Sequence, residues 1–144
     1  MKGKKQWIHL AQKDWNDAHD WKQKNRIAKI IRSNKLHHFP LFDQTIFINN
    51  TDFTWTKIHP QGFDSKEALL RQWSVFMPDM LFGLKNMIIE LDGDWHFNTE
   101  KGVKQTKRRN QYYEYAGIKL VTFVTKELEK MSDKKILDLL RENF

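Results

Sequence analysis

Three carboxylates with the spacing of an antiparallel hairpin are the residues of this sequence best suited to chemistry. Two apolar runs rich in Met, Leu, Phe and Ile flank a loop over residues 83–86. In the register that this loop sets, Asp79 pairs with Glu90, and cross-strand partners share a face with Cβ atoms about 5 Å apart. Asp92 lies two residues beyond Glu90, so it points to the same face. We therefore predict that Asp79, Glu90 and Asp92 converge on one side of the hairpin.

The three predicted carboxylates are suited to binding a metal ion. Like charges this close repel one another unless a cation or a proton lies between them, and oxygen ligands suit a hard divalent cation such as Mg²⁺. The chain has no Cys, which excludes a thiolate zinc site, an iron–sulfur cluster, a disulfide scaffold and a cysteine nucleophile. The alternative is a solvated hairpin face with scattered acids, but the flanking runs are typical of buried strands.

Helices and strands on both sides of the hairpin must hold it in place. Hydrophobic periodicity and turn residues predict helices over residues 14–35, 65–73, 102–116 and 126–142, and strands over residues 45–48, 53–58, 75–82, 87–92 and 118–124. Asp14 and Ser65 are suited to cap the first two helices. Gly117 ends the third helix, and the last can break near Ser132. The mixture predicts an α/β fold.

Length and composition bound the class of protein. A chain of 144 residues has room for one compact domain, and 40% apolar residues are enough for a packed core. No apolar run approaches the ~20 residues that span a bilayer, and the basic start of the chain lacks the apolar stretch of a secretory signal. We therefore expect a basic, cytoplasmic protein without a membrane partner.

The net charge of +7 is unevenly distributed along the chain. Residues 1–35 carry +7, residues 36–100 carry −5, residues 101–119 carry +5, and residues 120–144 are neutral. Basic segments attract polyanions such as nucleic acids, whereas a carboxylate-rich centre suits a bound metal ion. The arrangement indicates a protein that grips phosphates around a metal site.

Two predicted helices carry basic residues suited to DNA contact. One follows the carboxylates and presents a basic stripe, which can hold the DNA backbone. The other lies near the N-terminus and interleaves Trp with Lys, a pattern that suits phosphate contact with stacking or wedging. The alternatives are ordinary solvated faces, and Trp residues that pack a helix onto the core. The candidates for DNA contact are Lys101, Lys104, Lys107, Arg108, Arg109, Lys22, Arg26 and Lys29.

An ordered string of motifs resembles the PD-(D/E)xK nuclease superfamily. The string runs from Pro78-Asp79 through Glu90-Leu91-Asp92-Gly93 and Trp95-His96 to an Arg-bearing helix that is closed by Gly117 and followed by an apolar strand. Asp92 occupies the position of the superfamily's lysine. This departure is similar to the branch that contains the very-short-patch repair endonucleases and the related phage and intron homing endonucleases.

The resemblance implies a restriction-endonuclease-like core, in which helices flank a mixed central sheet. The nuclease core is then expected over residues 61–144. Residues 1–60 lie outside the resemblance and are expected to form a basic N-terminal extension of a helix and a hairpin.

The same resemblance implies a set of metal ligands. Asp79 and Glu90 would bind the metal ion, with the Leu91 carbonyl as an extra ligand. Asp92 would be a further ligand or would orient the attacking water. Glu67, on the helix that precedes the hairpin, would complete the site.

The resemblance also implies that residues beyond the hairpin carry out proton transfer. His96 would act as a general acid or base, or would stabilise the leaving group; the alternative is a surface imidazole beside Trp95. Because the motif lysine is missing, the residue that activates water is open, and Lys104 or Lys107 on the following helix can reach in.

These inferences together predict a metal-dependent DNA endonuclease that hydrolyses phosphodiester bonds with Mg²⁺, for which Mn²⁺ is expected to substitute. A junction-resolving or structure-selective nuclease is the alternative within this class. A non-catalytic DNA-binding module is the alternative outside it. We expect a monomer or a homodimer, encoded by a prokaryotic cell or a phage.

Overall fold

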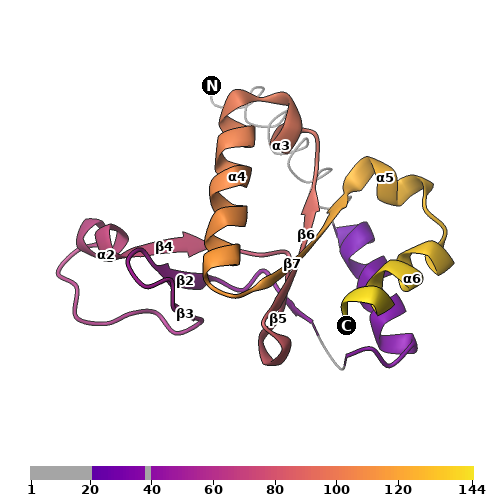
Figure 1. Cartoon of the computed structure of the whole chain (residues 1–144), viewed down its shortest axis with the longest axis horizontal. Helices are drawn as coiled ribbons and strands as arrows, with labels where there is room; N and C mark the ends of the chain where they lie inside the picture. Colours follow the sequence, from indigo (N-terminus) through magenta and orange to yellow (C-terminus); the bar gives the residue numbers. More distant parts are fainter. Residues whose placement is uncertain (1–20, 38–39) are drawn as a thin grey trace, which may run out of the picture. The chain divides into compact units, whose positions relative to one another are not determined.

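The computed structural model describes residues 21–37 and 40–144, which form helices and strands in a mixed α/β arrangement (Figure 1). A helix covers residues 21–33. The elements that follow are β1 (Leu41–Phe42), β2 (Ile46–Asn49), β3 (Trp55–Thr56), α2 (Lys66–Gln72), β4 (Trp73–Phe76), β5 (Met80–Phe82), the 3₁₀ turn η1 (Gly83–Lys85), β6 (Met87–Asp92), α3 (Trp95–Asn98), α4 (Glu100–Tyr115), β7 (Lys119–Val124), α5 (Thr125–Lys130) and α6 (Asp133–Asn143).

A four-stranded mixed sheet in the order β1-β5-β6-β7 contains the predicted hairpin. Strands β5 and β6 are antiparallel, with Met80 opposite Ile89 and Phe82 opposite Met87. This is the predicted register, and η1 with Asn86 in the left-handed conformation (φ 47°) forms the predicted loop. Strands β6 and β7 are parallel, so α3 and α4 make the crossover that a parallel pair requires.

A second, three-stranded antiparallel sheet has the order β3-β2-β4. We predicted one strand over residues 75–82, and this is wrong: the segment divides between β4 in this sheet and β5 in the other. Pro78 lies at the division. Proline has no N–H for a ladder hydrogen bond, so the chain leaves one sheet before it joins the next.

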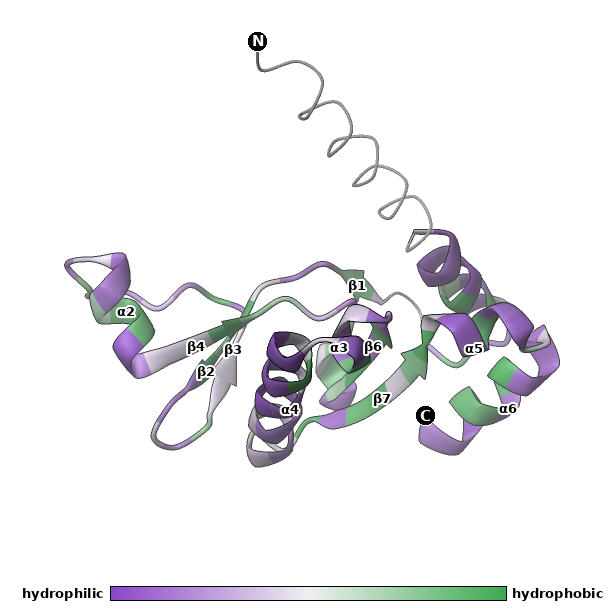
Figure 2. Ribbon diagram, turned by 90° about the horizontal axis from the view of Figure 1, so that it is seen from above, coloured by the Kyte–Doolittle hydropathy of each residue, from purple (hydrophilic) through white to green (hydrophobic). Residues whose placement is uncertain are grey.

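One buried cluster joins both sheets to α4. Its members come from β2, β5, β6, α4 and the residue just before β7, and they are Ile46, Ile48, Leu81, Ile88, Tyr113 and Ile118. Helix α4 is mostly hydrophilic along its length (Figure 2), and only Gly102 and Tyr113 of this helix are buried. The helix therefore meets the core along a narrow face, and the residues of that face decide what it can contact.

Several helices begin or end at the residues predicted from the sequence. The Ser65 hydroxyl accepts a hydrogen bond from the Ala68 N–H at the start of α2. Gly117, with φ of +72°, follows the end of α4. Helix α4 begins two residues earlier than predicted because the Thr99 hydroxyl accepts from the Gly102 N–H. The predicted break near Ser132 is confirmed, since Ser132 caps α6.

Contacts group the described residues into two compact units, residues 21–37 with 130–144 and residues 40–129. Hairpin β2–β3 pairs with β4, so the expected extension and the expected core share a sheet. The division at residue 60 stays a prediction.

In the smaller unit, the helix over residues 21–33 buries Ile27, Ile30 and Ile31, as its apolar periodicity predicts. The Arg26 guanidinium pairs with Asp133 on α6 at 2.8 Å. It also donates to the Met131 carbonyl. The expected cap at Asp14 lies outside the described residues. No helix among the residues that the structure describes is long and apolar enough to cross a membrane.

Candidate functional site

Two hydrogen bonds between backbone N–H groups and carboxylate oxygens join Asp79 to residues 90 and 91 of β6. The backbone N–H of Asp79 donates to Glu90 Oε1 at 2.8 Å. The backbone N–H of Leu91 donates to Asp79 Oδ2 at 2.7 Å. The residue before β5 thus binds the Glu90 carboxylate and β6 binds the Asp79 carboxylate, in agreement with the predicted register. Asp92, two residues further along β6, is buried with Glu90.

The surroundings of Glu90 raise its pKa. Its side chain is 4% exposed, and burial raises its pKa to about 7, with the Asp79 charge adding to the effect and Arg109 opposing it. The buried Tyr113 hydroxyl donates to Glu90 Oε2 at 3.0 Å. Burial and the neighbouring Glu90 charge also raise the pKa of Tyr113, so this phenol stays a hydrogen-bond donor.

Arg109 binds the carboxylates rather than presenting its charge on the outer face of α4. Its two terminal nitrogens donate to the two oxygens of Asp92, each at 3.0 Å. Its Nε lies 3.4 Å from Glu90 Oε2, and its side chain is 12% exposed. Burial lowers the pKa of Arg109, but the bond to Asp92 and the two acidic charges raise it by more. The prediction that Arg109 is a DNA-backbone contact is therefore corrected: it is a buried counter-ion.

His96 lies between Asp92 and α4. Its Nε2 is 3.6 Å from Asp92 Oδ1, and its side chain is 25% exposed. Its Nδ1 is 2.7 Å from the Thr106 hydroxyl. A bond to one ring nitrogen sets the proton position on the other, so Thr106 orients the imidazole toward Asp92. His96 is therefore a partly buried, doubly contacted residue rather than a free surface imidazole beside Trp95.

Gly102 allows α3, which carries His96, to lie against α4. A Cβ atom at residue 102 would clash with the Trp95 carbonyl oxygen and with the Thr99 hydroxyl. The glycine costs helix propensity, but it permits the backbone approach that places His96 opposite Thr106.

The oxygen donors have the chemistry of a Mg²⁺ site, although protein donors already occupy several of them. Asp79, Glu90 and Asp92 supply carboxylate oxygens, the donors that a hard divalent cation prefers. Within residues 21–37 and 40–144, however, no group of three acidic or histidine side chains is arranged as metal ligands. Arg109 holds both oxygens of Asp92. The residues therefore fit the expected cation in type, and a cation that binds Asp92 has to share it with Arg109.

Several predicted site residues are not brought to the carboxylates. Glu67 is exposed on α2, which lies at the end of the three-stranded sheet far from β6 in both views (Figures 1 and 2). Its expected role in completing the site is corrected. Lys104 is exposed and pairs with Glu100 at 3.3 Å, and Lys107 is exposed on the same helix. Neither contacts the three acids among the interactions of the described residues.

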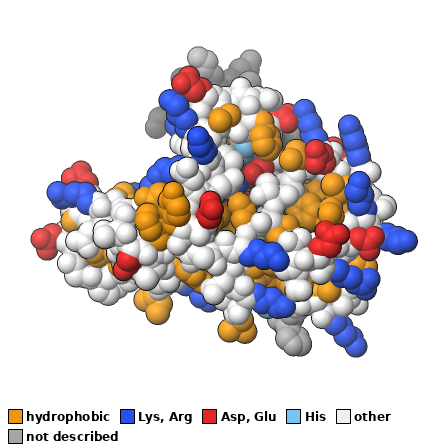
Figure 3. All heavy atoms as spheres, viewed as in Figure 1, with side chains coloured by type: hydrophobic (Ala, Val, Ile, Leu, Met, Phe, Trp, Pro, Cys, Tyr) orange, Lys and Arg blue, Asp and Glu red, His pale blue; other side chains and the backbone are white. Residues whose placement is uncertain are grey.

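The remaining DNA-contact candidates divide into four groups, and one of them is Arg108, whose guanidinium donates to the Ser74 hydroxyl at 2.6 Å. Lys101, Lys104 and Lys107 are exposed on α4, and Figure 3 shows Lys and Arg side chains along that part of the surface. Lys22 and Lys29 are exposed on the helix over residues 21–33, which belongs to the other unit. Arg26 of that helix pairs with Asp133 on α6, and its role in DNA contact stays a prediction.

Sequence reasoning missed the face of α4 that meets the site. Thr106, Arg109 and Tyr113 are spaced by three and four residues, which places them on one side of a helix. Each contacts a predicted site residue. The spacing was a signal available in the sequence, but it shows only which residues share a face, and their partners depend on packing.

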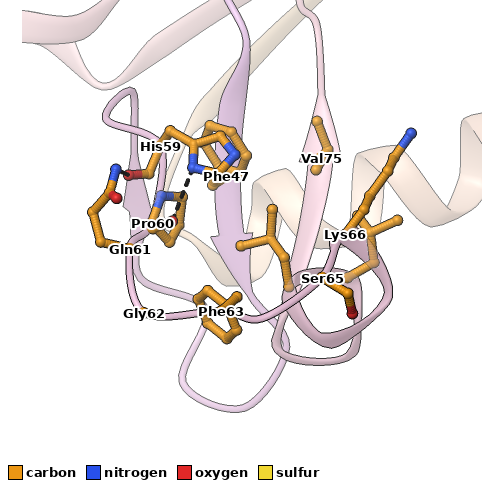
Figure 4. Close-up of a pocket in the computed structure, with 11 residues that line it drawn as sticks. Phe47, His59, Pro60, Gln61, Gly62, Phe63, Ser65, Lys66 and Val75 are labelled. Carbon is orange, nitrogen blue, oxygen red and sulfur yellow. Dashed lines mark hydrogen bonds between the residues drawn. The ribbon is translucent and has the colours of Figure 1, made fainter.

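Two cavities lie in the unit formed by residues 40–129. The larger, of about 520 Å³, lies against β2, β4 and α2 and contains none of the predicted catalytic residues (Figure 4). There His59 Nδ1 is 2.9 Å from the Pro60 carbonyl oxygen. The Gln61 amide donates to the His59 carbonyl oxygen. The smaller cavity, of about 390 Å³, includes His96 and Arg109 in its lining and adjoins the carboxylates.

Comparisons of the chain with protein-family models, with curated proteins and with solved structures found no match.

Proposed function

We propose that the protein is a metal-dependent DNA endonuclease with a restriction-endonuclease-like core. The observation that carries the proposal is the pair of hydrogen bonds that join Asp79 to Glu90 and Leu91 of β6, with Asp92 on the same strand and His96 3.6 Å from Asp92. Clustered carboxylates with an imidazole beside them suit metal-dependent phosphodiester hydrolysis.

A divalent cation is the expected cofactor, held by Asp79, Glu90 and Asp92, with the Leu91 carbonyl as a further ligand. When bound, such an ion supplies charge neutralisation at a phosphate and makes a water more nucleophilic. Mg²⁺ is the expected ion, and Mn²⁺ is expected to replace it. Burial raises the pKa of Glu90 to about 7, and a bound cation would lower it by favouring the charged form.

The chain's own residues provide orientation and proton transfer. Thr106 holds the His96 ring, so that the imidazole can give a proton to the departing oxygen. Tyr113 and Arg109 each bind Glu90, which keeps its carboxylate in one position. The exposed lysines of α4 provide charge for the DNA backbone.

A plasmid-nicking assay tests this proposal. Supercoiled DNA is incubated with the wild-type chain and with Asp79→Ala and Glu90→Gln variants, in Mg²⁺, in Mn²⁺ and in chelator. Cleavage should require the metal and should fall by at least about 100-fold in both variants. Glu67→Gln, which changes an exposed Glu far from β6, is the matched control and should cut normally. Equal cleavage by wild type, Asp79→Ala and Glu90→Gln would refute the assignment to these residues.

Arg109 favours one alternative, a non-catalytic DNA-binding module. Its bidentate bond to Asp92 completes a buried ion pair that needs no metal. DNA binding without cleavage across Mg²⁺ and Mn²⁺ would support this alternative. The same assay on linear, mismatched and branched DNA also tests the junction-resolving or structure-selective alternative, which requires cleavage of branched DNA only.

A further inference from the structure

The cavity beside the carboxylates is lined mainly by aromatic, polar and basic residues. Its lining residues are Val75, Phe76, Trp95, His96, Gln105, Thr106, Arg108 and Arg109, and none of them is acidic. Its volume of about 390 Å³ lies in the range of small-ligand sites, about 300–1,000 Å³. Because His96 and Arg109 both contact Asp92, a ligand here lies next to the proposed reacting phosphate.

One wall of this cavity is aromatic. Trp95 is 45% exposed, and its ring meets His96 edge-on at 5.4 Å between centroids. Phe76 contributes a second ring from β4. An exposed indole beside a cavity is a stacking surface, and every nucleobase has a face that can stack on it.

The cationic wall is held rigid by a network of side chains. The Arg108 guanidinium donates to the Ser74 hydroxyl at 2.6 Å, and it lies over the Tyr112 ring at 4.7 Å. The Ser74 hydroxyl in turn donates to Asn50 Oδ1, which also accepts from the Tyr112 hydroxyl. A guanidinium that is already fixed loses little conformational freedom when it binds a phosphate.

We propose that this cavity binds one unpaired nucleotide of the DNA strand, with its base against Trp95 and its phosphate toward Arg108. The inference rests on the proposed nuclease function, because it names the form of DNA that the site takes. In a duplex, both faces of a base are covered by its neighbours, so the base can reach Trp95 only when it leaves the stack. The site therefore selects DNA that contains an unpaired base.

Fluorescence anisotropy of labelled oligonucleotides in chelator tests the proposal without cleavage. Two matched DNAs are compared: a duplex, and the same duplex with a short unpaired stretch. The wild-type chain should bind the second more tightly by roughly tenfold, the scale of one base stacked on an aromatic ring. Trp95→Ala should remove this preference, and Trp95→Phe should keep most of it.

Phe97→Ala is the matched control. Phe97 lies on the same short helix α3 and is 51% exposed, but it does not line the cavity. Its removal should leave the preference for unpaired DNA unchanged. Equal losses in Trp95→Ala and Phe97→Ala, or equal wild-type affinity for both DNAs, would overturn the proposal.

The binding and cleavage assays separate this inference from the nuclease assignment. Metal-dependent cleavage by a wild-type chain that does not prefer unpaired DNA refutes the nucleotide site alone. If binding prefers unpaired DNA and the preference depends on Trp95, but no cleavage occurs under any condition, the nuclease assignment is refuted and the nucleotide site is supported.

Discussion

Arg109 donates two parallel hydrogen bonds to Asp92, each of 3.0 Å, from a helix that begins eight residues after that acid. Its Nε also approaches Glu90. One guanidinium thus bridges two acids of the candidate site, at the position where a cation would be expected. The balance between this guanidinium and a metal ion governs both the stability of the site and its proposed chemistry.

Replacing Arg109 by Met should destabilise the protein strongly. The change leaves Asp92 and Glu90 buried without their counter-ion, and breaking a buried pair in this way costs about 3–5 kcal/mol. Thermal and urea unfolding measure the loss. If the acids bind a divalent cation, added Mg²⁺ should recover part of the stability in this variant. Lys104→Met, which removes an exposed cation of the same helix, should change stability by less than about 0.5 kcal/mol.

Glu90 should make stability fall as pH rises from about 4.5 to 7. Its pKa is raised from 4.5 to about 7 in the folded chain, chiefly by burial, so the folded state binds more protons than the unfolded state in this interval. The difference corresponds to roughly 3 kcal/mol. Above pH 7 the contribution should level off. Urea unfolding at pH 5 and pH 7.5 measures the slope, which should be much smaller in Glu90→Gln. An identical slope in that variant would contradict the assignment.

Tyr113→Phe should weaken the site without disturbing the surface. The variant removes the hydroxyl that donates to Glu90 Oε2 and leaves a buried acceptor short of a partner, which costs about 1–3 kcal/mol. The pKa of Glu90 should also rise further, because a donor to its charged form is lost. Tyr115→Phe, at an exposed position of the same helix, is the control and should unfold like the wild type.

Gly102→Ala should separate α3 from α4. The added methyl group would meet the Trp95 carbonyl oxygen and the Thr99 hydroxyl, and overpacking of this kind costs about 1–3 kcal/mol. Gly83→Ala is the control, since its Cβ would meet only the Trp55 ring at 4.0 Å. Unfolding experiments compare the two variants. If the proposed function is right, only Gly102→Ala should also lose cleavage, because His96 lies on α3 and is displaced with it.

Thr106→Val should reduce cleavage while the fold is retained. The hydroxyl contacts His96 Nδ1 at 2.7 Å, and without it the imidazole loses its orientation toward Asp92. The rate of cleavage should fall by at least about tenfold, and its pH dependence should shift. Thr106→Ser keeps the hydroxyl and should keep most of the activity. Equal rates in the Val and Ser variants would show that Thr106 does not position His96.

The local pattern was sufficient to predict the hairpin and most helices. Asp79 reaches residues 90 and 91 because a short loop and two apolar runs specify one register, and a slip of one residue would turn every buried side chain to the wrong face. The caps at Ser65 and Ser132 also depend on local sequence alone, since each hydroxyl accepts a hydrogen bond from the N–H three residues further along the chain.

Tertiary structure alone decided which partners the acids have. Arg109 was predicted to contact DNA as part of the basic helix that follows the carboxylates, whereas its position on the face of α4 that meets the site brings it to Asp92. Glu67 was assigned to the site by its order along the chain, yet α2 packs beside β4. The amino-acid sequence by itself determined three acids on one face of a hairpin. The crossover through α3 and α4 determined that a guanidinium, a phenol and an imidazole surround them, because contacts between distant segments depend on how the helices pack.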